Sequence, residues 1–267
     1  MMNAAPSAGE LIREWRVRRR MSQLDLAGEA DISQRHLSFL ESGRAAPSRE
    51  MIIRLSERLD IPLRQRNRLL LVAGFAPGYG ESRIDDPSFA PAMDAVRMVL
   101  RGHEPSPAIA VDRNWNLVAA NRSLAPLLSD IADASLLEPP INVLRLSLHP
   151  RGLAPRIVNL GEWRAHLLER LRRQNETFAD PGLEELEREL RSYPGGITQR
   201  RPIHNEGTAI AHMLKLRVGD LTLSLISTIT VFGTPLDVTL SELAIESFFP
   251  ADEATRMALE RLGMASA

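Results

Sequence analysis

Three side chains of one short segment, those of Gln34, Arg35 and Ser38, have the chemistry needed to recognise DNA bases. Arginine and glutamine form paired hydrogen bonds with the major-groove edges of guanine and adenine, and a serine hydroxyl bonds to either. The segment begins at Ser33, a residue type that caps helix N-termini. We therefore predict a helix that presents these three residues outward as a base-reading surface.

Two short helices between Ser22 and Gly43 must position this surface. Ser22 is suited to cap the first helix, which we expect to end near Ala30, because a serine hydroxyl accepts a hydrogen bond from a free N–H of the first turn. The buried face of this helix is expected to consist of Leu24, Leu26 and Ala27.

The turn between the two helices has its own signals. Asp31 belongs to the few residue types that enter the left-handed region readily, and Ile32 offers an apolar side chain to fill the turn. In the second helix, Leu37 and Leu40 lie three apart on the inner face, and Gly43 is a helix-ending glycine. The spacing predicts a tight, packed helix-turn-helix.

These residues carry a family resemblance. The capping, packing and turn positions resemble those of the phage-repressor (XRE) type of helix-turn-helix and are Gln23, Ala27, Ile32, Ser33, Leu37, Leu40, Glu41, Gly43 and Pro47. The stretch from Ser33 to Gly74 resembles the MmyB-like branch of these bacterial transcription regulators. The resemblance implies a five-helix lambda-repressor-like domain followed by a PAS-like α+β ligand-binding domain with an antiparallel sheet.

The resemblance also implies roles for single residues. Gln23 matches a phosphate-contacting glutamine, Arg44 is placed for the DNA backbone, and Arg16 and Glu41 match a structural ion pair. Phe39 is expected either to contact a thymine methyl or to pack on the next helix. The resulting set of expected DNA-binding residues is Gln23, Ser33, Gln34, Arg35, Ser38, Phe39 and Arg44.

Charge distribution agrees with double-stranded DNA as the partner. The whole chain has a net charge of −1, but residues 1–80 contain 13 arginines against nine acidic residues, and the remainder is acidic. A basic half is what phosphate neutralisation requires. The excess of +4 is modest, so it supports the motif without identifying a DNA-binding protein by itself.

The whole chain divides into three parts. We expect a helical domain at 1–76, a linker and connecting helix at 77–106, and a second domain at 107–267. Residues 107–121 hold two apolar runs around a polar turn, which predicts a hairpin. Alternation at 212–218 and 221–231 predicts two more strands, and Val238 with Leu240 indicates a fifth. The PAS-like resemblance continues at both ends of this domain.

By the same resemblance, the second domain holds a small apolar ligand, such as a fatty acid, between sheet and helices. The expected lining is apolar and consists of Trp115, Leu117, Leu124, Leu128, Trp163, Leu167, Leu214, Leu223 and Leu225. For each of these residues the alternative is an ordinary core position, because every packed domain shows apolar periodicity.

Other classes of protein are disfavoured. The chain has no cysteine, no apolar run long enough to span a membrane and no signal-peptide core, so we expect a soluble cytoplasmic protein. Its histidines show no i, i+4 zinc spacing, and no catalytic motif is present, so we expect no enzyme, metal or cofactor. Haem at His166 or His212 is disfavoured.

We therefore interpret the sequence as that of a homodimeric, ligand-responsive DNA-binding regulator. The alternative is a protein-interaction and dimerisation module without a small-molecule effector. The polar outer face of the second helix favours DNA over a protein interface, which would show more apolar side chains there.

Overall fold

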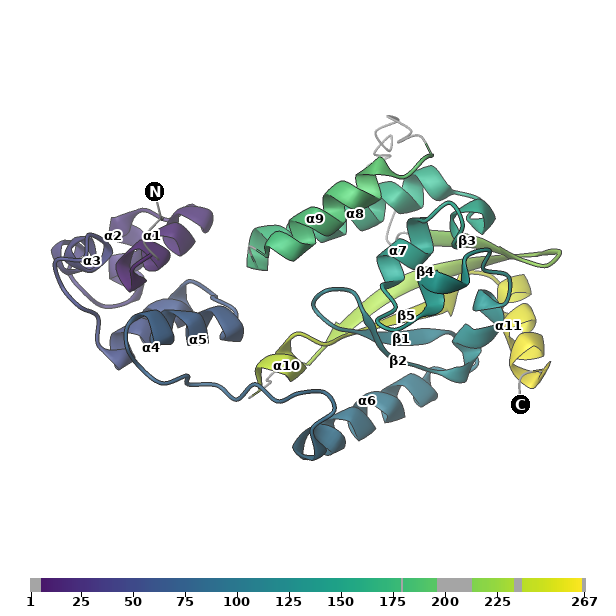
Figure 1. The fold of residues 1–267 in the computed structure, drawn as a ribbon, viewed down its shortest axis with the longest axis horizontal. Helices are drawn as coiled ribbons and strands as arrows, with labels where there is room; N and C mark the ends of the chain where they lie inside the picture. Colours follow the sequence, from purple (N-terminus) through teal and green to yellow (C-terminus); the bar gives the residue numbers. More distant parts are fainter. Residues whose placement is uncertain (1–5, 179, 196–212, 233–236, 266–267) are drawn as a thin grey trace. The chain divides into compact units, whose positions relative to one another are not determined.

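The computed structural model describes residues 6–178, 180–195, 213–232 and 237–265 (Figure 1). The chain forms two compact units. The first comprises Met1–Ser82 together with Pro235–Ser241, and the second comprises Arg83–Thr234 together with Glu242–Ala267. The first unit thus extends beyond residue 76, and it includes a short segment from far along the chain.

The first unit contains five helices from the N-terminal part of the chain, as predicted. They are α1 (Ala8–Arg18), α2 (Gln23–Glu29), α3 (Gln34–Glu41), α4 (Arg49–Arg58) and α5 (Leu63–Val72). A serine caps each of the first four, and its hydroxyl accepts a hydrogen bond of 3.1–3.2 Å from a first-turn N–H. Such caps fix the starts of these helices because they satisfy otherwise free donors.

One apolar cluster forms the core of this unit. Leu11, Ile12 and Trp15 of α1 and Leu37 and Leu40 of α3 belong to it. The prediction that Leu24 faces this core is wrong, because its exposed fraction is 65%. Successive helical residues are rotated by about 100°, so Leu24 lies on the far side of α2 from the buried Leu26.

The late segment of the first unit forms a short helix, α10 (Val238–Ser241). The Asp237 carboxylate accepts hydrogen bonds from the backbone N–H groups of Thr239 and Ser82, and the Thr239 hydroxyl donates to the Ser82 carbonyl at 2.6 Å. Val238 is fully buried. The predicted strand at Val238 and Leu240 is therefore wrong: Asp237 caps a helical turn at this position.

The second unit contains a five-stranded antiparallel sheet in the order β2-β1-β5-β4-β3. Its strands are β1 (Ala108–Val111), β2 (Leu117–Ala120), β3 (Met213–Val218), β4 (Leu221–Val231) and β5 (Ala244–Pro250). The two predicted hairpins, β1–β2 and β3–β4, are confirmed. The fifth strand, β5, begins after α10, and His212 lies outside the described residues.

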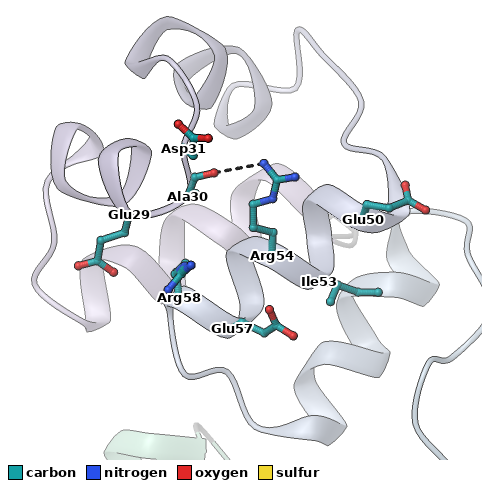
Figure 2. A pocket seen from close by; sticks show the side chains of 8 residues that line it. All are labelled: Glu29, Ala30, Asp31, Glu50, Ile53, Arg54, Glu57 and Arg58. Carbon is teal, nitrogen blue, oxygen red and sulfur yellow. Dashed lines mark hydrogen bonds between the residues drawn. The ribbon is translucent and has the colours of Figure 1, made fainter.

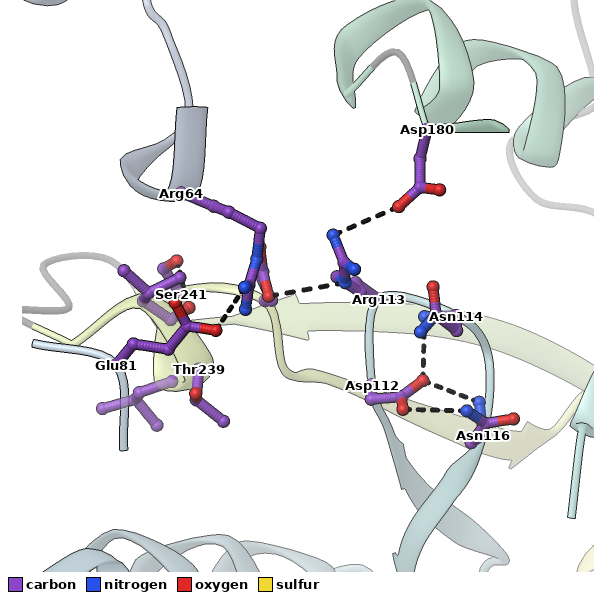
Figure 3. A network of polar contacts seen from close by, with 12 residues as sticks. Arg64, Glu81, Asp112, Arg113, Asn114, Asn116, Asp180, Thr239 and Ser241 are labelled. Carbon is purple, nitrogen blue, oxygen red and sulfur yellow. Dashed lines mark hydrogen bonds and ion pairs between the residues drawn. The ribbon is translucent and has the colours of Figure 1, made fainter. Parts of the chain in front are cut away.

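Polar contacts hold the tight loops of each unit, as Figure 3 shows. In the second unit, the Asp112 carboxylate accepts hydrogen bonds of 2.8 Å from the backbone N–H groups of Asn114 and Asn116, which closes the β1–β2 turn. In the first unit, Arg64 of α5 pairs with Glu81. These contacts stabilise turns whose backbone cannot pair within a regular element.

Helices complete the second unit. They are α6 (Ala90–Gly102), α7 (Val143–Leu148), α8 (Leu160–Phe178), α9 (Pro181–Ser192) and α11 (Glu253–Ala265), with 3-10 turns at Pro87–Phe89, Arg122–Leu128, Ala134–Leu137 and Ala154–Arg156. Helix α6 packs against β1 and β2, and α11 packs against β4 and β5. Within the described ranges, no helix combines the length and apolarity needed to cross a membrane.

Candidate nucleic-acid interface and ligand cavity

Local geometry sets the orientation of α3. Asp31 adopts the left-handed conformation with φ of 52°, and the Ile32 N–H donates to the Ala27 carbonyl at 3.0 Å. The Ser33 hydroxyl accepts from the His36 N–H at 3.1 Å, and Gly43 ends the helix region with φ of 70°. The turn therefore has the predicted backbone, because Asp and Gly tolerate positive φ better than most residues.

This geometry turns the expected base-reading residues outward. Gln34 and Arg35 are exposed, and Ser38 and Phe39 are half-buried, whereas Leu37 is completely buried. The guanidinium groups of Arg35 and Arg44 lie 5.3 and 5.9 Å from the centroid of the Phe39 ring. Phe39 thus brings two exposed arginines together at one surface, through cation–π contacts of moderate strength.

Arg16, Glu41 and Gln23 form a buried network that ties α1, α2 and α3 together. Arg16 Nε donates to Glu41 Oε1 at 2.7 Å, and Arg16 Nη2 donates to Glu41 Oε2 at 2.9 Å. Gln23 Nε2 donates to the same Oε2 at 2.8 Å. Both carboxylate oxygens therefore have donors, which is the arrangement a buried ion pair needs.

The network shifts the ionisation of its members. Burial acts to raise the pKa of Glu41, but the hydrogen bonds from Arg16 and Gln23 outweigh it and hold that pKa below its ordinary value. The hydrogen bond to Glu41 raises the pKa of Arg16. Gln23 commits its amide nitrogen to this network as a donor.

A hollow on the first unit is lined by more acidic than basic side chains, unlike the outward face of α3 with its arginine. It is lined by Glu29, Ala30, Asp31, Glu50, Ile53, Arg54, Glu57 and Arg58, and Figure 2 shows their side chains. Arg54 donates to the Ala30 carbonyl at 3.3 Å, which helps to close the end of α2. Four carboxylates against two guanidinium groups give this hollow a net negative lining, which disfavours phosphate.

The second unit contains an apolar cavity of about 80 Å³ between the sheet and the helices. Seven of the nine residues predicted to line a ligand site do line it, namely Leu117, Leu124, Leu128, Trp163, Leu167, Leu214 and Leu225. Leu223 and Trp115 are not among its lining residues: both pack in the surrounding core, and Trp115 Nε1 donates a hydrogen bond to Gln174 Oε1 at 2.6 Å.

Comparison with known proteins decides what kind of molecule this is. A model of the MmyB-like transcription regulator ligand binding domain matches residues 92–262, which is more than half of the chain. The chain belongs to this family. A helix-turn-helix model matches residues 12–65, and none of the curated proteins matches the chain. The protein is thus a DNA-binding transcription regulator with a ligand-binding domain, and the predicted resemblance to XRE-type helix-turn-helix and MmyB-like regulators is confirmed.

In this MmyB-like regulator, sequence reasoning missed the polar part of the cavity wall. Two polar residues, Ser147 of α7 and Glu246 of β5, line it among apolar neighbours. Glu246 is only 3% exposed, and its Oε1 accepts hydrogen bonds from Arg170 Nη1 at 3.0 Å and from the Ser227 hydroxyl. A carboxylate within the apolar run of β5 was the one available signal, since a buried strand rarely carries an unpaired charge.

Arg170 is itself held by its surroundings. Its guanidinium lies 4.2 Å from the centroid of the Trp115 ring, and Trp115 is buried. Burial lowers the pKa of Arg170, and the charge of Glu246 opposes this change. The predicted lining residue Trp115 therefore contributes indirectly, because it supports the arginine that pairs with a wall residue of the cavity.

Proposed function

We propose that this regulator reads DNA through α3 and responds to a small apolar ligand bound in its second unit. The observation that carries the first half is the exposure of Gln34 and Arg35 at the start of a helix whose inner face is fully buried. Helix starts of this kind enter the major groove in helix-turn-helix proteins. Ser38 and Phe39 extend the surface, and Gln23, Ser33 and Arg44 contact the DNA backbone.

We further propose that the protein acts as a homodimer. Two recognition helices would then occupy successive major grooves roughly 34 Å apart, and the ligand would change their spacing. The resemblance suggests a fatty acid as ligand, and the apolar wall around Trp163 and Leu167 suits a hydrocarbon chain, for which the cavity of about 80 Å³ would have to widen. A PAS-like sensor is consistent with a five-stranded antiparallel sheet that has helices packed on it.

The DNA-binding role is tested by comparing two variants on operators selected from random DNA. Arg35→Ala should relax the preference for particular bases and cost about 1–3 kcal/mol on the best site. Gln23→Ala should weaken binding to all sequences alike, because phosphate contacts carry no sequence information. Arg68→Ala is the matched control, since it removes the same charge from an exposed position on α5.

Equal losses from Arg35→Ala and Gln23→Ala on every sequence would contradict the assigned roles. If wild-type protein showed no salt-dependent binding to any DNA, the protein-interaction alternative would replace this proposal. A protein that stays monomeric both free at micromolar concentration and on DNA would contradict the paired half-sites.

The ligand-binding role is tested by extracting purified protein with organic solvent under denaturing conditions and identifying the released molecules by mass spectrometry. A stoichiometric apolar metabolite would support a sensor and reveal the class of its signal. An empty extract would favour a packed core whose role is dimerisation.

A further inference from the structure

A short segment from late in the chain belongs to the first unit. Residues 237–241, which we call the clasp, lie inside the range that the ligand-binding family model matches, 92–262, yet the structure groups them with Met1–Ser82. They belong to the connection between β4 and β5, two antiparallel strands that pair as far as Val231 and Ala244. Part of the connection of a hairpin from the ligand-binding domain is thus built into the first unit.

Hydrogen bonds hold the clasp against the segment 78–82, which follows α5. Asp237 Oδ2 accepts a hydrogen bond from the Ser82 N–H at 2.9 Å, and the Thr239 hydroxyl donates to the Ser82 carbonyl at 2.6 Å. The Val238 N–H donates to the carbonyl of residue 80 at 2.8 Å, and Val238 is fully buried. Backbone groups on both sides are paired, so the contact holds the clasp in one register.

The segment that receives the clasp is itself fixed to α5. Asn67 of α5 is only 6% exposed. Its Oδ1 accepts hydrogen bonds from the Gly78 N–H at 2.9 Å and the Tyr79 N–H at 3.1 Å, and its Nδ2 donates to the Tyr79 carbonyl at 2.8 Å. Leu70 of α5 belongs to the core of the first unit, to which α3 also contributes. Contacts therefore continue from the clasp through this segment and α5 to the core beneath the base-reading helix.

On its other side the clasp leads into the cavity wall. Strand β5 begins three residues after Ser241, and its Glu246 and Phe248 line the cavity. Strand β4 contributes Leu225 to the same wall and is hydrogen-bonded to β5. Two paired strands shift together, because separate movement would break the hydrogen bonds between them. A ligand that widens the cavity of about 80 Å³ displaces part of its wall, and a close-packed interior transmits such a strain.

We propose that the clasp couples the cavity to DNA binding: a ligand that widens the cavity shifts the β4–β5 hairpin, and the clasp passes this shift to residues 78–82 and α5, which changes DNA affinity. The inference rests on the proposed ligand-responsive function and names the element through which the two units communicate. Such coupling is reciprocal, so bound DNA must act on the cavity wall in turn. DNA alone can therefore reveal the coupling, and the test needs no ligand.

The test measures backbone hydrogen exchange of the full-length protein by mass spectrometry, with and without an operator selected from random DNA. Exchange rates report how easily a segment opens, so they respond when a distant site changes its stability. In the wild type, operator binding should change the exchange rate of the β5 amides by about fivefold or more, which is the lower range of allosteric coupling.

The double variant Asp237→Asn/Thr239→Val should abolish this operator effect. It removes both side-chain links to Ser82 and nearly keeps the volume of the two side chains. The asparagine oxygen can still accept the hydrogen bond from the N–H of residue 239, so the cap of α10 is kept. In this variant, exchange at 78–82 should become faster, and operator binding should no longer change exchange at 244–250.

A matched control applies similar changes to another capped turn. Asp133→Asn/Ser135→Ala alters an exposed 3-10 turn of the second unit, where the Asp133 carboxylate accepts hydrogen bonds from the Ser135 N–H and hydroxyl. This control should leave the operator effect on β5 as it is in the wild type.

The outcomes separate this inference from the proposed function. Operator-bound wild type with unchanged exchange in β5, or an operator effect that survives in the clasp variant, would overturn the clasp as the coupling element while DNA binding stands. A wild type that binds no DNA would overturn the proposed function, and the inference with it. The wild-type measurement needs no variant, so the inference stays testable even if the double variant fails to fold.

Discussion

Each unit of this regulator contains a buried Arg–Glu pair that joins distant parts of the chain, and the two pairs differ in how their hydrogen bonds are distributed. Glu41 receives hydrogen bonds on both oxygens, two from Arg16 and one from Gln23. Glu246 receives two, both on one oxygen, and lines a cavity. The first pair is closed, with a donor on each carboxylate oxygen, whereas in the second pair both hydrogen bonds share Oε1.

The ionisation of the two arginines shows the same contrast. The hydrogen bond to Glu41 raises the pKa of Arg16, whereas burial lowers the pKa of Arg170 despite the charge of Glu246. A bidentate pair repays the cost of burying its charges better than a pair with one contact. The same two residue types therefore lock three helices together in one unit and place a carboxylate in a cavity wall in the other.

Removing the arginine of the closed pair should have the largest effect. Arg16→Met leaves Glu41 buried without its main donor, and we expect the first unit to lose about 3–5 kcal/mol of unfolding free energy. Arg170→Met should cost the second unit less, about 1–3 kcal/mol, because it removes one hydrogen bond to Glu246 where Arg16→Met removes two to Glu41, and Ser227 remains as a donor. Urea unfolding, followed by tryptophan fluorescence, measures both.

The double variant Arg16→Met/Glu41→Leu serves as the control for this prediction. It should recover much of the loss, because it removes the buried charge together with its partner. Similar losses from Arg16→Met and Arg170→Met would show that the two pairs do not differ as described.

Replacing each glutamate by its amide should have an intermediate effect. In Glu41→Gln the new NH2 group must face a donor of Arg16 or Gln23, and we expect a loss of about 1–3 kcal/mol. In Glu246→Gln the amide oxygen can keep the hydrogen bonds from Arg170 and Ser227, but the buried Arg170 loses its counter-charge, so we expect a loss of about 1–3 kcal/mol here as well. Thermal unfolding of the two variants checks these losses, and a loss near zero in either variant would contradict them.

The smallest effect should be the pH dependence of the stability that Glu41 contributes. Because the pKa of Glu41 is lowered in the folded protein, its contribution to stability is fully present above the ordinary value of 4.5 and is lost as the pH falls through the folded-state pKa. The difference in unfolding free energy between wild type and Glu41→Gln should therefore shrink as the pH falls below 4.5. A difference that stays constant down to pH 3 would show that Glu41 does not carry this dependence.

The helix-turn-helix could be predicted from the sequence almost residue by residue. Ser33 caps α3, Asp31 takes the left-handed conformation and Leu37 is buried, all as expected. These features depend on hydrogen bonds and periodicity within a few residues, which a sequence displays directly. The prediction that Leu24 is buried was wrong because a seven-residue helix offers too little periodicity to tell its two faces apart.

The cavity could be predicted only in part. Its apolar wall follows from the sequence, because alternating and helical leucines such as Leu167 and Leu225 mark residues that face a core. The position of Glu246 in that wall, beside Arg170 76 positions away, depends on the folded arrangement, and so does the place of residues 237–241 in the first unit. The reason is physical: burial and pairing of a charge depend on which distant segments the fold brings together, and no local pattern records that.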